Sequence, residues 1–193
     1  MLKQAHFVRS VPDHRGLPRD CGSEVAFAGR SNAGKSTALN ALTEQSRLAR
    51  VSKTPGRTQH LVVFELAPEK RLIDLPGYGF ARVPLAVRAA WGQMMEDYFH
   101  SRTSLKALLL CMDIRHPLTE FDQQMLAFAT QRGLPCHILL SKADKLSRGA
   151  AANTLLAVKK ELRDLGLTAS VQVFSALAGT GVDAAREWVI AKL

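Results

Sequence analysis

The segment Gly29-Arg30-Ser31-Asn32-Ala33-Gly34-Lys35-Ser36-Thr37 decides the fold because of what lies on either side of it. An apolar run at residues 25–28 precedes the segment, and a helical pattern begins at Lys35. A tight turn between a strand and a helix points backbone N–H groups inward, and the helix adds the positive end of its dipole. The pattern GxxxxGK[ST] therefore predicts a phosphate-binding loop. The alternative is an ordinary glycine-rich turn.

The loop also predicts what each side chain contributes. Lys35 is expected to reach the β- and γ-phosphates of a nucleotide, and the Ser36 hydroxyl is expected to bind Mg²⁺. Both residues open a helical pattern, so they would lie where the strand-to-helix turn meets its ligand.

Short apolar runs alternate with helical patterns after Cys21, which is typical of an α/β protein. The strand candidates are residues 24–28, 61–66, 71–75, 105–113, 136–141 and 169–174, and the helix candidates are residues 35–46, 85–101, 120–132, 150–165 and 182–192. Residues 61–75 have room only for two strands and a tight turn, so we expect these two strands to pair antiparallel. The sequence predicts a mostly parallel six-stranded sheet with one antiparallel edge strand and helices on both faces.

Residues 1–20 contain Pro12, Gly16, Pro18 and several basic side chains, with little periodicity. We interpret them as an irregular basic arm and residues 21–193 as one nucleotide-binding domain. The composition, 47% hydrophobic and 22% charged, is that of a folded globular protein. The three widely separated cysteines, Cys21, Cys111 and Cys136, favour reduced thiols over a disulfide framework.

The distribution of apolar residues and the net charge indicate where the protein works and what kind of partner it binds. No apolar run approaches the ~20 residues that span a bilayer, and the first ten residues lack the apolar stretch of a secretory signal. We therefore expect a cytoplasmic protein. The net charge of +9 favours a polyanionic partner, with RNA as the natural candidate. The alternative is that the excess of Lys and Arg only keeps the protein soluble.

A second motif lies far downstream, where an apolar strand ends in Ser141-Lys142-Ala143-Asp144. A carboxylate at Asp144 can accept two hydrogen bonds from the N1–H and 2-amino groups of guanine, whereas adenine lacks both donors on that edge. Lys142 is expected to lay its aliphatic stem along the base. Alone, these residues could form a surface turn with Asp144 as a helix N-cap.

Three weaker elements complete the pattern. Asp74-Leu75-Pro76-Gly77 matches DxxG, in which the carboxylate holds Mg²⁺ through water and the glycine N–H senses the γ-phosphate; its alternative is a Pro-Gly turn. The polar stretch Lys53-Thr54-Pro55-Gly56-Arg57-Thr58-Gln59 offers a second hydroxyl for Mg²⁺, and we prefer Thr58 to Thr54. Phe174-Ser175-Ala176 would close over the guanine. Their order at strand ends fits the rule that open α/β sheets bind ligands at the carboxyl ends of their strands.

The stretches GRSNAGKST, KTPGRTQ, DLPGYGFA, SKAD and FSA resemble the EngB (YihA/YsxC) family of bacterial ribosome-assembly GTPases, over essentially residues 7–192. The resemblance implies a Ras-like P-loop GTPase fold, binding of GTP or GDP with Mg²⁺, and slow GTP hydrolysis as a switch in assembly of the large ribosomal subunit. It also implies a role in normal division septum formation. Its motif assigns Gly56, Arg57, Thr58, Gln59 and His60 to the nucleotide site. The expected partner is ribosomal RNA or ribosomal protein, with no DNA specificity, and we expect a monomer.

Tyr78 follows the DxxG element, where signalling GTPases carry a glutamine that orients the attacking water. We do not assume that a phenol does the work of that glutamine, and we expect slow hydrolysis, with Lys35, Thr58 and Gly77 as the catalytic residues. An exposed loop tyrosine without a catalytic part is the alternative to a direct role. Asn32 is a hypothetical potassium ligand, because an asparagine in the P-loop of related GTPases holds K⁺.

The loops and the arm are rich in cations, and we expect the γ-phosphate to order the loops and present this charge to RNA. The residues concerned are Lys3, Arg9, Arg15, Arg19, Arg47, Arg50, Lys53, Arg57, Arg82 and Arg88. Two rival functions remain open from the sequence. One is a P-loop ATPase or nucleotide kinase, against which Asp144 argues; the other is an RNA-binding assembly factor whose nucleotide is structural.

Overall fold

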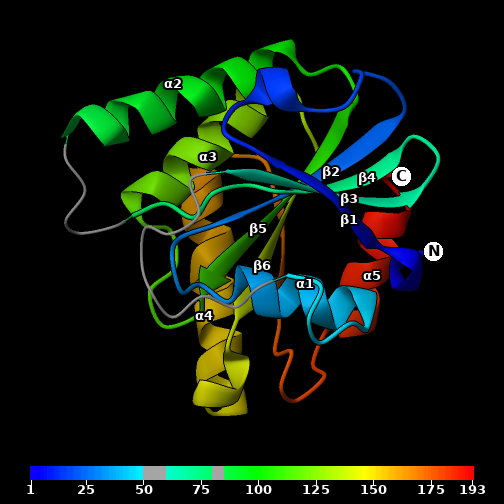
Figure 1. Cartoon of the computed structure of the whole chain (residues 1–193). Helices are drawn as coiled ribbons and strands as arrows, with labels where there is room; N and C mark the ends of the chain where they lie inside the picture. Colours follow the sequence, from blue (N-terminus) through cyan, green and yellow to red (C-terminus); the bar gives the residue numbers. More distant parts are fainter. Residues whose placement is uncertain (50–59, 80–84) are drawn as a thin grey trace.

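The computed structural model describes residues 1–49, 60–79 and 85–193 (Figure 1). The strands are β1 (His6–Val11), β2 (Ser23–Gly29), β3 (Leu61–Ala67), β4 (Lys70–Asp74), β5 (Leu105–Asp113), β6 (Cys136–Ser141) and β7 (Ser170–Val173). The helices are α1 (Lys35–Thr43), α2 (Leu85–Ser101), α3 (Glu120–Gln131), α4 (Arg148–Asp164) and α5 (Val182–Ile190), with short 3-10 helices η1 (Leu2–Gln4), η2 (His14–Gly16) and η3 (Ala143–Lys145). The α/β prediction is confirmed.

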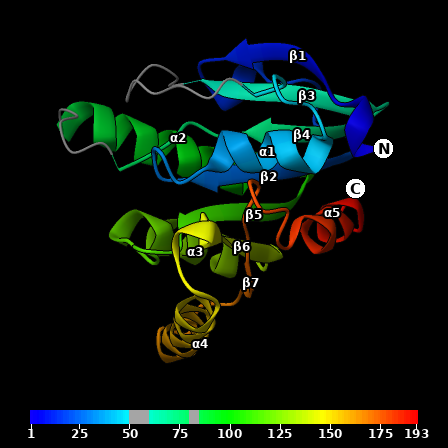
Figure 2. The same cartoon turned by 90° about the horizontal axis from the view of Figure 1, so that it is seen from below.

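The sheet has seven strands in the order β1-β3-β4-β2-β5-β6-β7, which Figure 2 shows one below the other. The predicted antiparallel pair of β3 and β4 is present, with Val63 opposite Ile73, but the antiparallel strand β3 is not at the edge as predicted, because β1 lies outside it. The prediction of six strands is wrong, because residues 6–11 of the expected irregular arm form β1 and pair antiparallel with β3. This edge strand has a bulge between Phe7 and Arg9, and most of its residues are exposed. It therefore lacks the apolar pattern that marks the inner strands.

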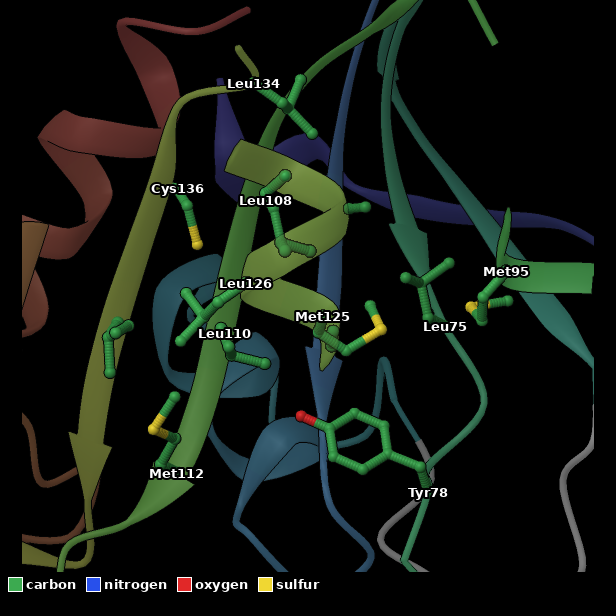
Figure 3. Close-up of a cluster of buried hydrophobic side chains, with 14 of the residues drawn as sticks. Leu75, Tyr78, Met95, Leu108, Leu110, Met112, Met125, Leu126, Leu134 and Cys136 are labelled. Carbon is green, nitrogen blue, oxygen red and sulfur yellow. The ribbon is translucent and has the colours of Figure 1, made fainter. Parts of the chain in front are cut away.

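Helices cover both faces of the sheet, as predicted. Along β2, Val25 and Phe27 pack in the layer with α1 and α5, whereas Ala26 and Ala28 pack in the layer with α2, α3 and α4. Figure 3 shows part of the second layer, where Leu108 and Leu110 of the sheet lie near Met125 and Leu126 of α3. The inner strands read as continuous apolar runs because each is buried on both faces.

Charged residues are enclosed at the amino ends of β2 and β4. Glu24 is fully buried and bonds to Arg71 Nη1 at 3.2 Å and to Arg102 Nη2 at 2.6 Å. Asp20 lies beside them and accepts bonds from the backbone and hydroxyl groups of Thr103 and Ser104. This network joins the segment before β2 to the turn between α2 and β5.

The parallel strands β2, β4, β5, β6 and β7 all direct their carboxyl ends to one edge of the sheet. Register places Gly29 beside Cys111, and Asp113 beside Ser141. The motif residues that end these strands therefore meet at one edge.

All three cysteines are free thiols, and burial raises the pKa of Cys111 and of Cys136 to about 12. No helix in the described ranges is long and apolar enough to span a membrane.

Candidate functional site

The loop of residues 29–36 makes the turn that the sequence predicts. Gly29 packs so closely on β5 that a Cβ there would lie 2.7 Å from the carbonyl oxygen of Cys111. Gly34 has a φ of +88°, and Asn32 adopts the left-handed region with a φ of +64°. The backbone N–H of Ala33 donates to the carbonyl of Arg30 at 2.9 Å, and α1 begins at Lys35. Glycine is thus required at two positions of this turn.

Lys35 forms an ion pair with Asp74 across the loop, which brings together two predicted site residues from β4 and α1. Their side chains are 12% and 13% exposed, so the pair is mostly enclosed and keeps a small accessible edge. Ser36 and Thr37 follow in the first turn of α1. The Ser36 hydroxyl and the Asp74 carboxylate are hard oxygen donors of the kind that Mg²⁺ prefers. The donor set at this end of α1 therefore fits a magnesium ion.

The Asp74-Leu75-Pro76-Gly77 element lies directly on the loop. The N–H of Leu75 donates to the carbonyl of Phe27 at 2.9 Å, which extends the parallel pairing of β4 with β2. Leu75 and Pro76 are buried, whereas Gly77 is partly exposed. A Cβ at Gly77 would lie 3.6 Å from the backbone of Ser31. The predicted γ-phosphate sensor therefore lies next to the predicted phosphate cradle.

Tyr78 is buried, which corrects the alternative of an exposed loop tyrosine. Its ring packs against Trp91 and Phe121, and Figure 3 shows it directed into the apolar cluster beneath Met125. Its hydroxyl donates to Asp122 Oδ1 at 2.6 Å. Burial, together with the nearby Asp122 carboxylate, raises the pKa of Tyr78 well above its usual value. The side chain at the glutamine position is thus held in the core.

The Ser141-Lys142-Ala143-Asp144 element contacts the same loop from β6. The hydroxyl of Ser141 donates to the carbonyl of Ala33, and it also lies 3.0 Å from the carbonyl oxygen of Met112. The ammonium of Lys142 donates to the carbonyl of Asn32. Residues more than 100 positions apart in the sequence are therefore joined by direct hydrogen bonds.

Asp144 is oriented by the last strand. The hydroxyl of Ser175 donates to Asp144 Oδ1 at 2.6 Å, and this bond lowers the pKa of the carboxyl. The N–H of Ala143 donates to the carbonyl of Phe174 at 3.1 Å, which binds the two segments together through the backbone. Ala176 follows, partly buried. Asp144 is thus an ionised acceptor held at the surface, as recognition of guanine requires.

Asp113 was missed by sequence reasoning. It ends β5 and lies 3.0 Å from the Lys142 ammonium, and its carboxylate also accepts from the backbone and guanidinium of Arg115. The bond from Arg115 holds the pKa of Asp113 well below its usual range, against the opposing effect of partial burial. The signal in the sequence was its position, since polar residues at the carboxyl ends of strands mark the ligand edge of such sheets.

Several predicted residues lie outside the described residues or away from the loop. Gly56, Arg57, Thr58 and Gln59 are outside the described ranges, as are the cations at positions 50, 53 and 82. His60 lies before β3, where its Nδ1 is 3.2 Å from the Ser10 hydroxyl of β1. The cations of the expected arm are partly paired: Lys3 with Glu44 and Arg15 with Asp13.

Comparison with known proteins agrees with this geometry. A family model described as a 50S ribosome-binding GTPase matches residues 24–142. The chain is 58% identical to a probable GTP-binding protein EngB of Stenotrophomonas maltophilia strain K279a, over 96% of this chain and 94% of that protein. It is 54% identical to the protein of the same name from Xanthomonas oryzae pv. oryzae strain PXO99A, over 96% of this chain and 90% of the relative.

Solved structures share the fold at lower identity. A crystal structure of a probable GTP-binding protein engB covers 89% of this chain and all of its own, with a TM-score of 0.68 and 21% identity. The structure of Era in complex with MgGDPNP and nucleotides 1506–1542 of 16S ribosomal RNA covers 89% of this chain and 56% of its own, with a TM-score of 0.65 and 22% identity. At these identities the likeness extends to the fold.

Proposed function

Because this chain belongs to the EngB family of GTP-binding proteins, we propose that it binds GTP and GDP with Mg²⁺ and hydrolyses GTP slowly in the cytoplasm. We further propose that the nucleotide acts as a switch during assembly of the large ribosomal subunit, and that the protein has a role in normal septum formation. The observation that carries the proposal is the contact of Ser141 and Lys142 with the loop of residues 29–36. This contact supports placing the proposed phosphate-binding loop and the proposed base-binding residues in one site.

The proposed binding mode assigns a role to each described group. Backbone N–H groups of residues 31–36 and the start of α1 would hold the phosphates. Lys35 would exchange its bond to Asp74 for the β- and γ-phosphates, leaving Asp74 and Ser36 to hold Mg²⁺. When bound, Mg²⁺ neutralises charge on the phosphate oxygens. Thr58, outside the described residues, is our candidate for a second hydroxyl.

Guanine selection rests on Asp144, which Ser175 holds ready to accept two hydrogen bonds. The test is competition of bound fluorescent GDP by GTP, GDP and ATP in the presence of Mg²⁺. We expect GTP and GDP to compete and ATP to be weaker by at least about 100-fold, because adenine leaves the carboxylate unpaired. Equal competition by ATP would remove the proposal of a guanine site.

Slow hydrolysis follows from the burial of Tyr78, since the side chain at the glutamine position lies in the core. Help must come from another group, and Asn32, which is exposed, is our candidate potassium ligand. GTP turnover in potassium and sodium buffers of equal ionic strength tests this part. Equal rates in the two buffers would exclude a role for potassium.

The coupling to the ribosome is tested separately, by sedimentation of the GTP-analogue and GDP forms with large subunits at several salt concentrations. We expect the analogue form to cosediment more and the difference to depend on salt. Equal cosedimentation of the two forms would show that nucleotide and ribosome are uncoupled.

A second candidate function is an assembly factor whose nucleotide is structural, which the burial of Tyr78 favours. Measuring phosphate release with and without large subunits separates the two. Release that rises with subunits supports the switch, and release that stays negligible supports the static module.

A further inference from the structure

Tyr78 and Asp122 form a buried link between the DLPGYG loop and the start of α3. The Tyr78 hydroxyl donates to Asp122 Oδ1 at 2.6 Å, and Asp122 is 1% exposed. The other carboxylate oxygen, Oδ2, accepts from the backbone N–H of Thr119 at 2.9 Å and from its hydroxyl at 2.8 Å. One carboxylate therefore holds both the loop and the N-terminus of α3.

The backbone of Tyr78 is joined to the phosphate loop at the same time. The N–H of Ser31 donates to the carbonyl of Tyr78 at 2.8 Å, and Tyr78 forms a parallel bridge with Arg30. Gly79 follows with a φ of +75°, so close to Arg30 that a Cβ there would lie 2.8 Å from Arg30 Cγ. Tyr78, the residue after Gly77, is thus held to the phosphate loop by its backbone and to Asp122 by its side chain.

Neither partner can readily satisfy itself elsewhere. Burial raises the pKa of Asp122, and the bonds from Tyr78 and Thr119 oppose that effect. The Tyr78 ring is enclosed by Trp91 and Phe121, with ring centroids at 5.5 and 6.0 Å. Separating the pair would leave the buried Tyr78 hydroxyl and Asp122 Oδ1 without each other, while Oδ2 kept its bonds from Thr119, and an unpaired buried polar atom is costly. The link therefore holds one position of the loop firmly.

We propose that Asp122 is a positioning residue for the nucleotide site, acting through Tyr78 to hold Gly77 where a γ-phosphate would meet its N–H group. The inference rests on the proposed function, because it concerns the γ-phosphate of the same nucleotide. GDP lacks that phosphate, so the link affects the triphosphate and not the diphosphate. Preorganised donors bind better than donors that must first be ordered.

The test is Tyr78→Phe, which keeps the ring and removes only the hydroxyl. We expect affinity for a non-hydrolysable GTP analogue to fall about three- to tenfold, with GDP affinity changed less than about twofold. Single-turnover phosphate release should fall by a similar factor. Titration with fluorescent GDP and the analogue measures both affinities.

Thr119→Ala is the matched control, because it disturbs the same carboxylate and the α3 N-terminus without touching Tyr78. It should lower thermal stability but leave the ratio of analogue affinity to GDP affinity unchanged. If Tyr78→Phe does not fold, Asp122→Asn serves instead. It should shift the ratio in the same direction by a smaller factor, since an amide oxygen still accepts from a phenol, although less strongly than a carboxylate does.

The outcomes separate the two proposals. Wild-type protein that binds no guanine nucleotide overturns the proposed function. Wild-type binding with an unchanged affinity ratio in Tyr78→Phe, or with the same change in Thr119→Ala, overturns the positioning role and leaves a purely structural bond.

Discussion

The two ends of the central sheet both carry ion pairs, but they differ in how far the charges are enclosed. At the amino end, Glu24 is 0% exposed and its partner side chains Arg71 and Arg102 are each 8% exposed. At the carboxyl end, Lys142 is 32% exposed and Asp144 is 19% exposed. Charges of the first group are fully satisfied within the protein, whereas those of the second can still accept another partner. We therefore assign the amino end to stability of the fold and propose the carboxyl end as the ligand site.

The largest effect should come from breaking the closed network with Glu24→Gln. It removes the carboxylate that two buried guanidinium groups share, although Arg102 keeps an ion pair with Asp20 at 3.7 Å, and this costs about 3 kcal/mol of unfolding free energy. Urea denaturation measures the loss, and Glu187→Gln on the exposed side of α5 should change stability by less than about 0.5 kcal/mol. A Glu24→Gln protein of normal stability but weakened GDP binding would reverse the assignment of the two ends.

Lys35→Ala should produce the opposite profile. We expect GDP and GTP affinity to fall about 100-fold, equivalent to ~2.7 kcal/mol, because the ammonium that meets the phosphates is gone. Stability should fall less than in Glu24→Gln, by about 1 kcal/mol, because the substitution leaves one partly accessible carboxylate, Asp74, without its ammonium partner. Lys106→Ala removes the same charge at the amino end, where Lys106 bonds to the Thr103 carbonyl. If both variants lose affinity equally, net charge alone explains the result.

The extent to which a strand is buried decides whether the sequence could predict it. The inner strands β5 and β6 were predicted with their observed bounds, because burial on both faces makes their sequences continuously apolar. Strand β1 was missed because its residues are mostly exposed, and no apolar periodicity distinguishes an edge strand of this kind from a loop. Its pairing with β3 depends on partners 50 or more positions away.

At the site, motifs of fixed spacing revealed Lys35, Asp74 and Asp144, because their chemistry constrains residue types at short range. Asp113 and Asp122 belong to no such motif. Their roles arise from distant contacts: Asp113 pairs with Lys142, 29 positions later in the chain, and Asp122 bonds to Tyr78, 44 positions earlier. Only the folded arrangement brings these pairs together. The residues that we propose to bind a ligand were therefore easier to find from the sequence than those that we propose to position them.

A third prediction concerns the base end of the open edge. Asp144→Asn should weaken GTP binding about 30-fold (~2 kcal/mol) and improve binding of xanthosine triphosphate, because an amide can donate to the xanthine 2-oxo group. The fold should be spared, since the Ser175 hydroxyl can still donate to the amide oxygen. Competition titrations with both nucleotides measure the shift, with Asp164→Asn on α4 as the control. Unchanged discrimination would mean that the base binds elsewhere.

The smallest expected effect is that of Asp113→Asn, which tests whether the open edge contains its own supporting charge. The carboxylate holds the Lys142 ammonium while that ammonium also bonds to the phosphate loop, so neutralising it should weaken GTP and GDP binding equally, by about fivefold (~1 kcal/mol). Arg115→Ala is the matched control, because it removes the other partner of Asp113 and leaves Lys142 paired. Raising the salt concentration should shrink the difference between wild type and Asp113→Asn, since this pair lies within reach of water. A loss confined to Arg115→Ala would instead assign the supporting role to the guanidinium, and the distinction between the two ends would then rest on Lys35 and Asp144 alone.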